Sequence, residues 1–394
     1  MDMSDSFAKR FRAALAKKAQ EDLLRTRRIV EDDYAGVLNV DGKAYLNFAA
    51  NDYLGLRFDE RVLQPFVEGL SKYGAGSGAS PLVTGHSIEH ARLEAWLAEK
   101  LGREAVLLFS SGFAANHALC QALLQKNDVV VSDKLMHASF IEGAMVSEAH
   151  LKRFAHNDIA HARTLLDGID SSHAVLLASE GVFSMDGDTA PVADLVSLAH
   201  ESNAMLMLDD AHALGVLGDR GLGSVDAFNL TQDDCPVLMG TFGKAVGTSG
   251  AFIAGSHELI DYLVNHAKHY IYSTAMSAAN ARATLASLEL IVAGEQRTRL
   301  FANIARFRDG VARHGLPVLA SNTAIQPFII GSADGVLQAS DYLRSLGVWV
   351  GAIRSPTVPK GSDRLRITLS AVHCDKDIDA LIDALCLLRE QEWG

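Results

Sequence analysis

Six short apolar runs between positions 105 and 255 constrain the fold of this chain most strongly. They are AVLLF (105–109), DVVVS (128–132), HAVLLAS (173–179), AMLMLD (204–209), PVLMG (236–240) and GAFIAG (250–255). Unbroken apolar runs of this length are typical of strands that are covered on both faces. Helical stretches such as DTAPVADLVSLAHES separate several of them. This alternation predicts an α/β fold with a mainly parallel sheet and helices on both sides.

The flanking regions have different patterns. Residues 6–28 read as one helix with a basic surface, and a long helix is expected near 275–310. The runs AIQPFIIG, GVWVGAI and RLRITLS then alternate with helical stretches, of which the last has an apolar stripe at Ile378, Leu381, Ile382 and Leu385. We therefore expect an N-terminal helical segment (1–50), a large α/β domain (51–285) and a smaller α+β domain (286–394).

Composition excludes several classes of function. The net charge of the 394 residues is −12, which disfavours nucleic acid and anionic membrane surfaces as partners. The four cysteines are widely spaced, so no close pair predicts a zinc or redox site. No apolar run approaches the roughly 18 residues that a membrane span needs, and the first residues lack an apolar signal core. We expect no metal and a cytoplasmic location.

A lysine lies in a glycine-rich connection between two of the apolar runs. The stretch MGTFGKAVGTSG (239–250) places Lys244 among four glycines and without an acidic neighbour. Only residues 241–249 join the flanking strands, which is too short for a helical crossover. The two strands should therefore be antiparallel if they are neighbours. A lysine removed from water in such a turn could act as a nucleophilic amine.

Two further motifs follow strands at the edge where α/β sheets bind ligands. LMLDDAHALG places Asp209 and His212 after a buried strand, where the acid could fix a pyridinium proton and the histidine could donate to a phenolate oxygen. A capping aspartate and a structural histidine are the alternative. FSSGFAANHA reads as strand, turn and helix, so the backbone N–H groups of Gly112 and Phe113 could bind phosphate.

Other polar residues after strands are less specific. His137 could stack on a flat cofactor or be a structural histidine, and Ser184 lies in a polar loop. In RLRITLS, Arg364, Arg366 and Thr368 share one face, either turned inward to a substrate carboxylate or outward on a surface strand. The glycine-rich stretch KYGAGSGAS lacks the spacing of a dinucleotide-binding fingerprint, so a nicotinamide dehydrogenase is not favoured. Pyridoxal 5'-phosphate (PLP) suits this combination of residues. The combination comprises a helix start that could bind phosphate, a histidine ring that could stack, a buried acid, a second histidine and a lysine.

Several motifs in order resemble one family. NFAANDYLGL, SSGFAANHA, SEGVFSMDGD, DDAH, TFGKAVGTSG, IYSTAMS and IRSPTVPKGSDRLRITLSAVH are similar to segments of the α-oxoamine synthases, which are fold-type I PLP enzymes. The resemblance runs from about residue 20 to the C-terminus. IRSPTVP, LRITLSAVH and FAHND (154–158) are most similar to the members that act in biotin biosynthesis. The resemblance to the α-oxoamine synthases implies an aspartate aminotransferase-like fold with a seven-stranded, mainly parallel sheet and a smaller C-terminal α+β domain.

The resemblance also implies a reaction and its residues. L-alanine and a pimeloyl thioester, carried by coenzyme A or an acyl carrier protein, would condense with loss of carbon dioxide. Lys244 would hold PLP as a Schiff base, Asp209 would pair with the ring nitrogen, His212 with the ring hydroxyl, and His137 would stack on the ring. The other cofactor positions are Gly112, Phe113, Ser184, Thr241 and Thr274, the last reaching the phosphate of a partner subunit in a homodimer. The substrate positions are Arg25, Asn51, His137, Thr357 and Arg366.

Two segments depart from the family pattern and leave the acyl chain open. DDAHALG has Ala213 and Leu214 where a glycine is usual, and SGASPLVTGHS has Pro81 and His86 in a loop of small residues. We expect both segments near the substrate channel. An α-oxoamine synthase that acts on glycine and acetyl-CoA is one alternative, and a catalytically silent PLP-fold binding protein is another. The basic segment Arg25–Arg28 is expected to meet the phosphates of the carrier.

Overall fold

The computed structural model describes residues 3–391 and divides into two compact units. Residues 51–301 form one unit, and residues 1–50 form the other together with residues 302–394. The three-part division expected at positions 50 and 285 stays a prediction. Within the described range, no helix combines the length and the apolar character that crossing a membrane requires.

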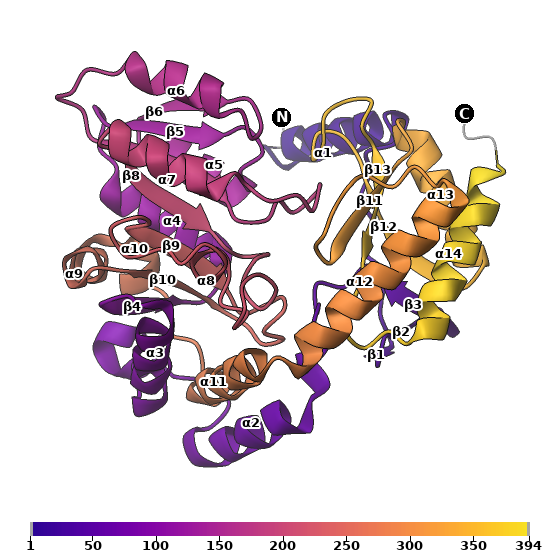
Figure 1. The fold of residues 1–394 in the computed structure, drawn as a ribbon, viewed down its shortest axis with the longest axis horizontal. Helices are drawn as coiled ribbons and strands as arrows, with labels where there is room; N and C mark the ends of the chain where they lie inside the picture. The colour runs from indigo at the N-terminus through magenta and orange to yellow at the C-terminus, as the bar shows by residue number, and fades with distance from the viewer. Residues whose placement is uncertain (1–2, 392–394) are drawn as a thin grey trace. The chain divides into compact units, whose positions relative to one another are not determined.

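The unit of residues 51–301 is built on a seven-stranded sheet (Figure 1). The strand order is β4-β10-β9-β8-β7-β5-β6. The strands are β4 (Ala105–Phe109), β5 (Val129–Asp133), β6 (His150–Phe154), β7 (Val175–Glu180), β8 (Met205–Asp209), β9 (Val237–Thr241) and β10 (Ala251–Gly255). β10 is antiparallel to both of its neighbours, and the other pairings are parallel. The expected mainly parallel sheet is confirmed, as is the antiparallel pairing across the Lys244 connection.

Helices pack around this sheet and bury its strands. They are α2 (Glu60–Tyr73), α3 (Ile88–Leu101), α4 (Gly112–Leu123), α5 (Ala138–Val146), α6 (Ile159–Asp167), α7 (Val192–Glu201), α8 (Ser224–Ala227), α9 (His257–His266), α10 (Lys268–Ile271) and α11 (Ala278–Ala293). Every residue of β5 and of β10 is buried. One core cluster joins Val130, Leu176 and Met207 of the strands to Leu119 of α4 and Phe140 of α5. Apolar side chains on successive positions of these strands are therefore shielded from water on both faces.

The helix expected near 275–310 is two helices. α11 ends at Ala293, and α12 runs from Glu295 to His314. Between them, Gly294 has φ +84°, and its N–H donates to the carbonyl groups of Leu290 and Ile291. A glycine in this left-handed conformation is a common way for a helix to end. The sequence pattern predicted both helical stretches but not the break at Gly294 between α11 and α12.

The other unit is built on a six-stranded sheet of order β1-β2-β3-β12-β13-β11. Its strands are β1 (Asp32–Tyr34), β2 (Val37–Val40), β3 (Lys43–Phe48), β11 (Ile325–Ile329), β12 (Val348–Ile353) and β13 (Arg364–Thr368). Its helices include α1 (Met3–Gln20), α13 (Ala333–Ser345) and α14 (Asp375–Arg389). The predicted apolar stripe of α14 is buried at Ile378, Leu381, Ile382 and Leu385, as expected.

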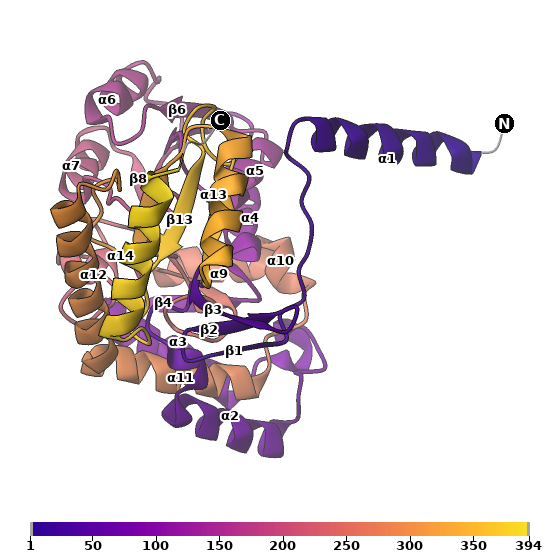
Figure 2. The ribbon, with the colours of Figure 1, turned by 90° about the vertical axis from the view of Figure 1, so that its right-hand side faces the viewer.

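Two features near the N-terminus differ from the prediction. The helix expected over 6–28 ends at Gln20, where Asp22 adopts a left-handed φ of 54°, and an extended segment leads on to β1 (Figure 2). β1, β2 and β3 were not anticipated, because DDY, VLNV and KAYLNF are short and none of them is an unbroken apolar run. β3 is held by parallel pairing to β12, a partner some 300 positions away that local pattern cannot reveal.

Candidate functional site

Most of the predicted cofactor residues follow strands that end at one edge of the seven-stranded sheet. β4, β5, β7, β8 and β9 run in the same direction, so their carboxyl ends share that edge. Gly112 and Phe113 follow β4, His137 follows β5, Ser184 follows β7, Asp209 and His212 end or follow β8, and Thr241 and Lys244 end or follow β9. Ligands of open α/β sheets bind at this edge. The structure therefore brings together residues that span 133 sequence positions, from 112 to 244.

Lys244 lies in a tight turn that is anchored in the core on both sides. The N–H of Gly247 donates to the carbonyl of Lys244 at 2.9 Å, and the Phe242 N–H donates to the Gly250 carbonyl at 2.9 Å. The neighbours Ala245 and Val246 are buried, while Lys244 is half-buried. The turn fixes the lysine backbone and leaves the side chain partly accessible, which a lysine that must meet a ligand requires.

Asp209 is a buried carboxylate held by side-chain and backbone donors. It is 3% exposed. Asn116 Nδ2 donates to Asp209 Oδ2 at 2.8 Å, and the Ala211 N–H donates to Oδ1 at 3.0 Å. Asn116 Nδ2 also lies 3.0 Å from Ser139 Oγ, which in turn lies 2.8 Å from His137 Nδ1. One network thus orients the acid expected at the ring nitrogen and the ring expected to stack on the cofactor.

Glu180 is a second buried acid beside Asp209. The two residues are paired across β7 and β8, and Glu180 is 3% exposed. Burial and the neighbouring Asp209 charge raise the pKa of Glu180 well above its ordinary value, although Lys244 and the backbone N–H of His137 oppose the shift. Burial beside a second carboxyl group therefore favours the neutral form of Glu180, so the two acids at the ends of β7 and β8 differ in environment.

His137 is a neutral ring at neutral pH. Burial lowers the pKa of His137, the Asp209 charge opposes the shift, and the Lys244 charge adds to it. A neutral imidazole can lie against an aromatic cofactor without the desolvation cost of a cation. His137 also caps α5 through its Nδ1, which accepts from the Ser139 N–H at 3.3 Å.

His212 is linked to the predicted substrate residue Asn51 through a tyrosine. The Tyr53 hydroxyl lies 2.7 Å from His212 Nδ1 and 3.2 Å from Asn51 Oδ1. His212 and Tyr53 are both buried. By contrast, Ala213 and Leu214 are 0% and 2% exposed core residues. Both side chains pack in the core, and their expected place near a substrate channel stays a prediction.

The start of α4 forms the expected strand–turn–helix junction. Ser111 caps the helix by accepting from the Ala114 N–H, so Gly112 and Phe113 occupy its first turn. A Cβ added at Gly112 would lie 3.8 Å from Thr241 Oγ1. The first turn of α4 and the end of β9 are thus adjacent, as two contacts of one phosphate group require.

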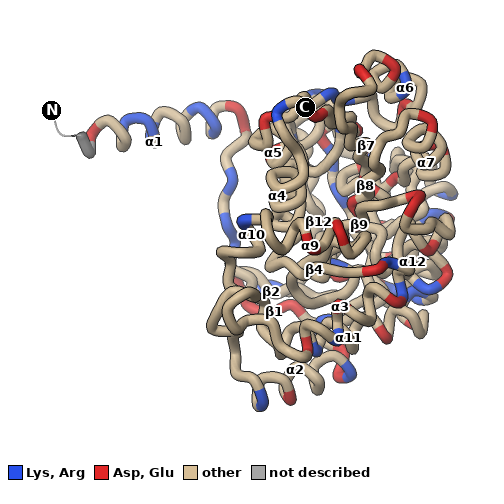
Figure 3. Tube along the Cα trace, turned by 90° about the vertical axis from the view of Figure 1, so that its left-hand side faces the viewer, with Lys and Arg blue, Asp and Glu red and all other residues tan. Residues whose placement is uncertain are grey.

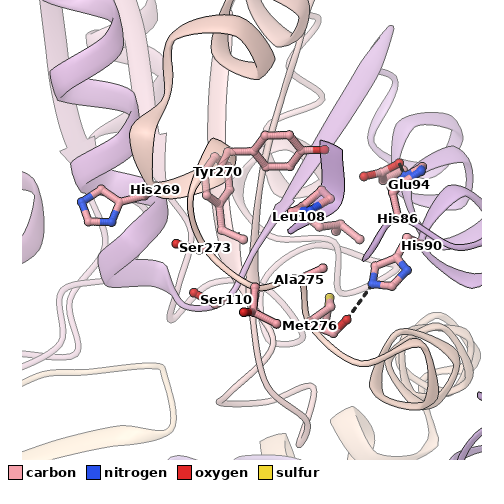
Figure 4. A pocket seen from close by; sticks show the side chains of 13 residues that line it. His86, His90, Glu94, Leu108, Ser110, His269, Tyr270, Ser273, Ala275 and Met276 are labelled. Carbon is pink, nitrogen blue, oxygen red and sulfur yellow. Dashed lines mark hydrogen bonds and ion pairs between the residues drawn. The ribbon is translucent and has the colours of Figure 1, made fainter. Parts of the chain in front are cut away.

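Thr274 lies elsewhere in the same unit, in a pocket that is also lined by Pro81 and His86. Figure 4 shows this pocket, with His86 and Ser273 among the labelled residues. His86 Nε2 lies 2.8 Å from Glu94 Oε2, and this hydrogen bond raises the pKa of His86. His90 Nε2 bonds to the Met276 carbonyl at 2.9 Å. Thr274 itself is exposed. The loop that departs from the family pattern therefore packs beside the threonine predicted to reach a partner subunit.

The predicted substrate residues of the other unit are placed in two groups. Arg25 and Thr357 line one pocket together with Arg354, whose guanidinium donates to the Asp22 carbonyl. Arg366 and its neighbour Arg364 lie on β13 and are both buried. The surface-strand alternative for β13 is wrong, because all five of its residues are buried.

Three residues of the site were missed by sequence reasoning. Tyr53, Asn116 and Glu180 all lie inside the motifs NFAANDYLGL, SSGFAANHA and SEGVFSMDGD. Their positions were visible, but their partners are 159, 93 and 29 positions away, and only the fold shows that they meet His212 and Asp209.

The donor set fits PLP. The buried carboxylate suits the ring nitrogen of that cofactor, and the neutral imidazole suits its ring face. The half-buried lysine suits its aldehyde, and the start of α4 beside Thr241 suits its phosphate. In this arrangement Lys244 would hold PLP, Asp209 would meet its ring nitrogen, and Gly112, Phe113 and Thr241 its phosphate.

Comparison with known proteins agrees with the fold and the cofactor. The chain is 50% identical over 374 residues to an 8-amino-7-oxononanoate synthase of Aeromonas hydrophila subsp. hydrophila, covering 95% of this chain and 93% of that protein. Among solved structures, the serine palmitoyltransferase of S. paucimobilis with a bound PLP–myriocin aldimine matches with a TM-score of 0.91, 26% identity and coverage of 98% of both chains. An 8-amino-7-oxononanoate synthase from Francisella tularensis matches with a TM-score of 0.76 and 28% identity, covering 87% of this chain and 97% of that one.

These matches confirm the fold-type I architecture and the resemblance to the α-oxoamine synthases, and they confirm PLP as the cofactor. The family model for aminotransferase class I and II matches residues 43–385, which is most of the chain. The chain therefore belongs to the aminotransferase class I and II family.

Proposed function

We propose that this protein condenses L-alanine with a pimeloyl thioester to give 8-amino-7-oxononanoate, carbon dioxide and the free thiol carrier, a step of biotin biosynthesis. The observation that carries the proposal is the 50% identity over nearly the full length to an 8-amino-7-oxononanoate synthase. The placement of Lys244, Asp209 and His137 at one sheet edge supports it, because a silent binding protein has no need of that set.

The residues of the large sheet have defined tasks in this reaction. PLP, when bound, supplies an electron-accepting ring that stabilises negative charge at the α-carbon of the amino acid. Asp209 holds a proton on the ring nitrogen, and Asn116 keeps the carboxylate oriented for that bond. Lys244 Nζ, freed when alanine binds, takes the α-proton as general base. His137 covers one ring face, Ser184 contacts the cofactor, and His212 donates to the ring hydroxyl with Tyr53 fixing its orientation.

Substrate binding is assigned to the residues that the family resemblance points to. Arg366 supplies a planar guanidinium suited to the alanine carboxylate, and Asn51 supplies a side-chain amide suited to a polar substrate group. Arg25 and Thr357, which line one pocket, bind the thioester substrate. Arginines on the extended segment after α1 suit the phosphates of a carrier, since the body of the protein is acidic overall.

The working assembly is a homodimer in which Thr274 contacts the phosphate bound by the partner subunit. Large apolar side chains in the neighbouring segments support this. Val83 lies in the turn Pro81–Gly85, whose Pro81 lines a pocket with Thr274, and Val83 and Tyr272 are 73% and 81% exposed in the single chain. Exposed apolar side chains of this size close to a functional residue are typical of an interface.

A product assay over a small matrix of substrates tests the function. L-alanine with pimeloyl-CoA or pimeloyl-acyl carrier protein should yield 8-amino-7-oxononanoate, and glycine with acetyl-CoA should yield little product. Preference for the glycine pair would favour another α-oxoamine synthase. The assay is needed because alanine differs from glycine by one methyl group, which an apolar pocket discriminates by only about 1–3 kcal/mol. If the purified protein mixed with PLP shows no visible Schiff-base band that borohydride bleaches, a silent binding protein is favoured.

A further inference from the structure

A histidine outside the described site bridges two aspartates. His156 Nδ1 lies 3.1 Å from both carboxylate oxygens of Asp133, and Nε2 lies 2.8 Å from Asp188 Oδ2. Asp133 is fully buried, and His156 is mostly buried. Asn157 strengthens the cluster, because its N–H donates to Asp133 at 2.8 Å and its Nδ2 donates to Asp188 at 2.9 Å.

The geometry fixes the protonation state of this ring. Both ring nitrogens face carboxylate oxygens, which only accept hydrogen bonds, so both nitrogens must donate. A ring that donates from both positions is the imidazolium cation. Burial opposes the charge, but the hydrogen bonds and charges of Asp133 and Asp188 outweigh it and raise the pKa of His156 to about 9. These two carboxylates are the charged groups that face the ring, one from β5 and one from the loop after β7.

Each aspartate anchors a segment that leads to the cofactor site. Asp133 ends β5, and its Oδ1 accepts from the Leu135 N–H at 2.7 Å, at the start of the connection to His137. Asp188 closes the loop that carries Ser184, because the Phe183 N–H donates to its carbonyl at 2.9 Å and Val182 pairs with Thr189. The His156 ring also packs edge-on against Phe183, with centroids 4.4 Å apart.

The motif FAHND has a physical reason at most of its positions. Phe154 is a buried residue at the end of β6, and His156 is the cation between the aspartates. Asn157 has a left-handed φ of 55°, which asparagine tolerates well, and this turns its amide toward Asp188. Asp158 caps α6 by accepting from the His161 N–H at 2.9 Å.

We propose that His156 is a positioning residue, an imidazolium clamp between Asp133 and Asp188 that sets the His137 connection and the Ser184 loop in the geometry that binds PLP. The clamp acts on the cofactor through other residues and does not itself touch substrate. The proposal rests on the proposed function only in that His137 and Ser184 contact the cofactor.

The test measures PLP affinity and backbone exchange in the full chain after removal of the cofactor. His156→Gln keeps hydrogen-bonding capacity but cannot carry charge. It should raise the PLP dissociation constant about tenfold, the equivalent of one charge-assisted hydrogen bond. Amide hydrogen exchange in peptides covering 181–189 should accelerate as well. His161→Gln is the matched control, because it makes the same change five positions away, in the first turn of α6, and removes only a side-chain bond to the Ala155 N–H.

The pH profile separates a charged clamp from mere packing. Wild-type PLP affinity should fall in an extra step as pH rises through about 9, where His156 loses its proton, and this step should be absent in His156→Gln. Asp188→Asn removes one of the two opposing charges, so it should move the step to lower pH while the fold stays intact.

Wild-type affinity, exchange and pH profile in His156→Gln would overturn the proposal, as would an equal loss in His161→Gln. Because PLP binding is the readout, the result stands whichever thioester or amino acid proves to be the substrate.

Discussion

Three carboxyl groups lie at the ends of the neighbouring strands β5, β7 and β8, and the chain handles each differently. Asp133 is neutralised by the His156 cation, and Asp209 is held by N–H donors. Glu180 lies between them, and burial together with the Asp209 charge raises its pKa well above the ordinary value. Adjacent buried anions repel one another, so each of the three carboxyl groups needs its own means of limiting that repulsion.

Glu180→Gln should stabilise the protein relative to wild type increasingly as pH rises above about 4.5 toward the raised pKa of Glu180. The raised pKa of Glu180 means that the folded chain keeps a proton which the unfolded chain releases above about pH 4.5. Wild type therefore loses stability as pH rises toward the folded-state pKa, by about 1.4 kcal/mol for each unit of elevation, and glutamine removes that loss. Thermal unfolding at several pH values measures it, with the exposed Glu99→Gln as control. Parallel pH profiles for Glu180→Gln and wild type would contradict the assignment.

The sequence predicted some residues of the candidate site and not others. Lys244, Asp209 and His137 were found because each is an unusual residue type beside an apolar run. Asn116 and Tyr53 were missed because asparagine and tyrosine carry no local signal, and their bonds to Asp209 and His212 form only when distant strands align. The His156 clamp was missed for the same reason, since its three members lie in three separate segments.

At the scale of elements, apolar runs predicted six strands of the large sheet to within a few residues. β6 was not among them, because HLKRF is polar and lies at the sheet edge, where only Phe154 is fully buried. The split between α11 and α12 depends on one glycine, which periodicity does not register. Periodicity thus finds elements that bury a face and fails for edge strands and single-residue breaks.

The backbone conformation of the Lys244 turn requires glycine at position 247 but not at position 243. Gly247 has φ +73°, and a Cβ there would lie 2.6 Å from the Arg57 backbone nitrogen. Gly247→Ala should therefore lower unfolding free energy by about 2 kcal/mol or more, from the left-handed conformation and the clash. Gly243→Ala is the matched control, because the nearest atom to its Cβ is 3.9 Å away. Equal denaturant midpoints for the two variants would show that the turn adjusts to both.

The N-terminal segment presents a basic element on an acidic protein. Lysines and arginines recur along α1 and the segment after it (Figure 3), and Arg25 lies in the pocket with Thr357. Arg25→Gln should raise the KM for the thioester by about fivefold to tenfold and weaken its salt dependence, as loss of one phosphate contact predicts. Arg10→Gln, on exposed α1, should change neither. The role fails if Arg25→Gln leaves both the KM and the salt response unaltered.

At the scale of the whole molecule, the proposed dimer makes assembly and cofactor retention inseparable. Sedimentation should give a mass of about twice the 42.3 kDa chain. A double variant, Val83→Asp with Tyr272→Asp, places charges on exposed apolar positions, so it should yield monomers that release PLP while remaining folded. Wild type that sediments as a monomer with full PLP content would contradict the shared site.

The central claim is that Lys244 is the amine that holds PLP. Borohydride reduction of the PLP-loaded protein, followed by protease digestion and mass spectrometry, identifies the modified residue directly. The account predicts that the reduced cofactor is found on the peptide containing Lys244 and that Lys244→Ala is not labelled. Label on another lysine, or equal labelling of Lys244→Ala, would contradict it.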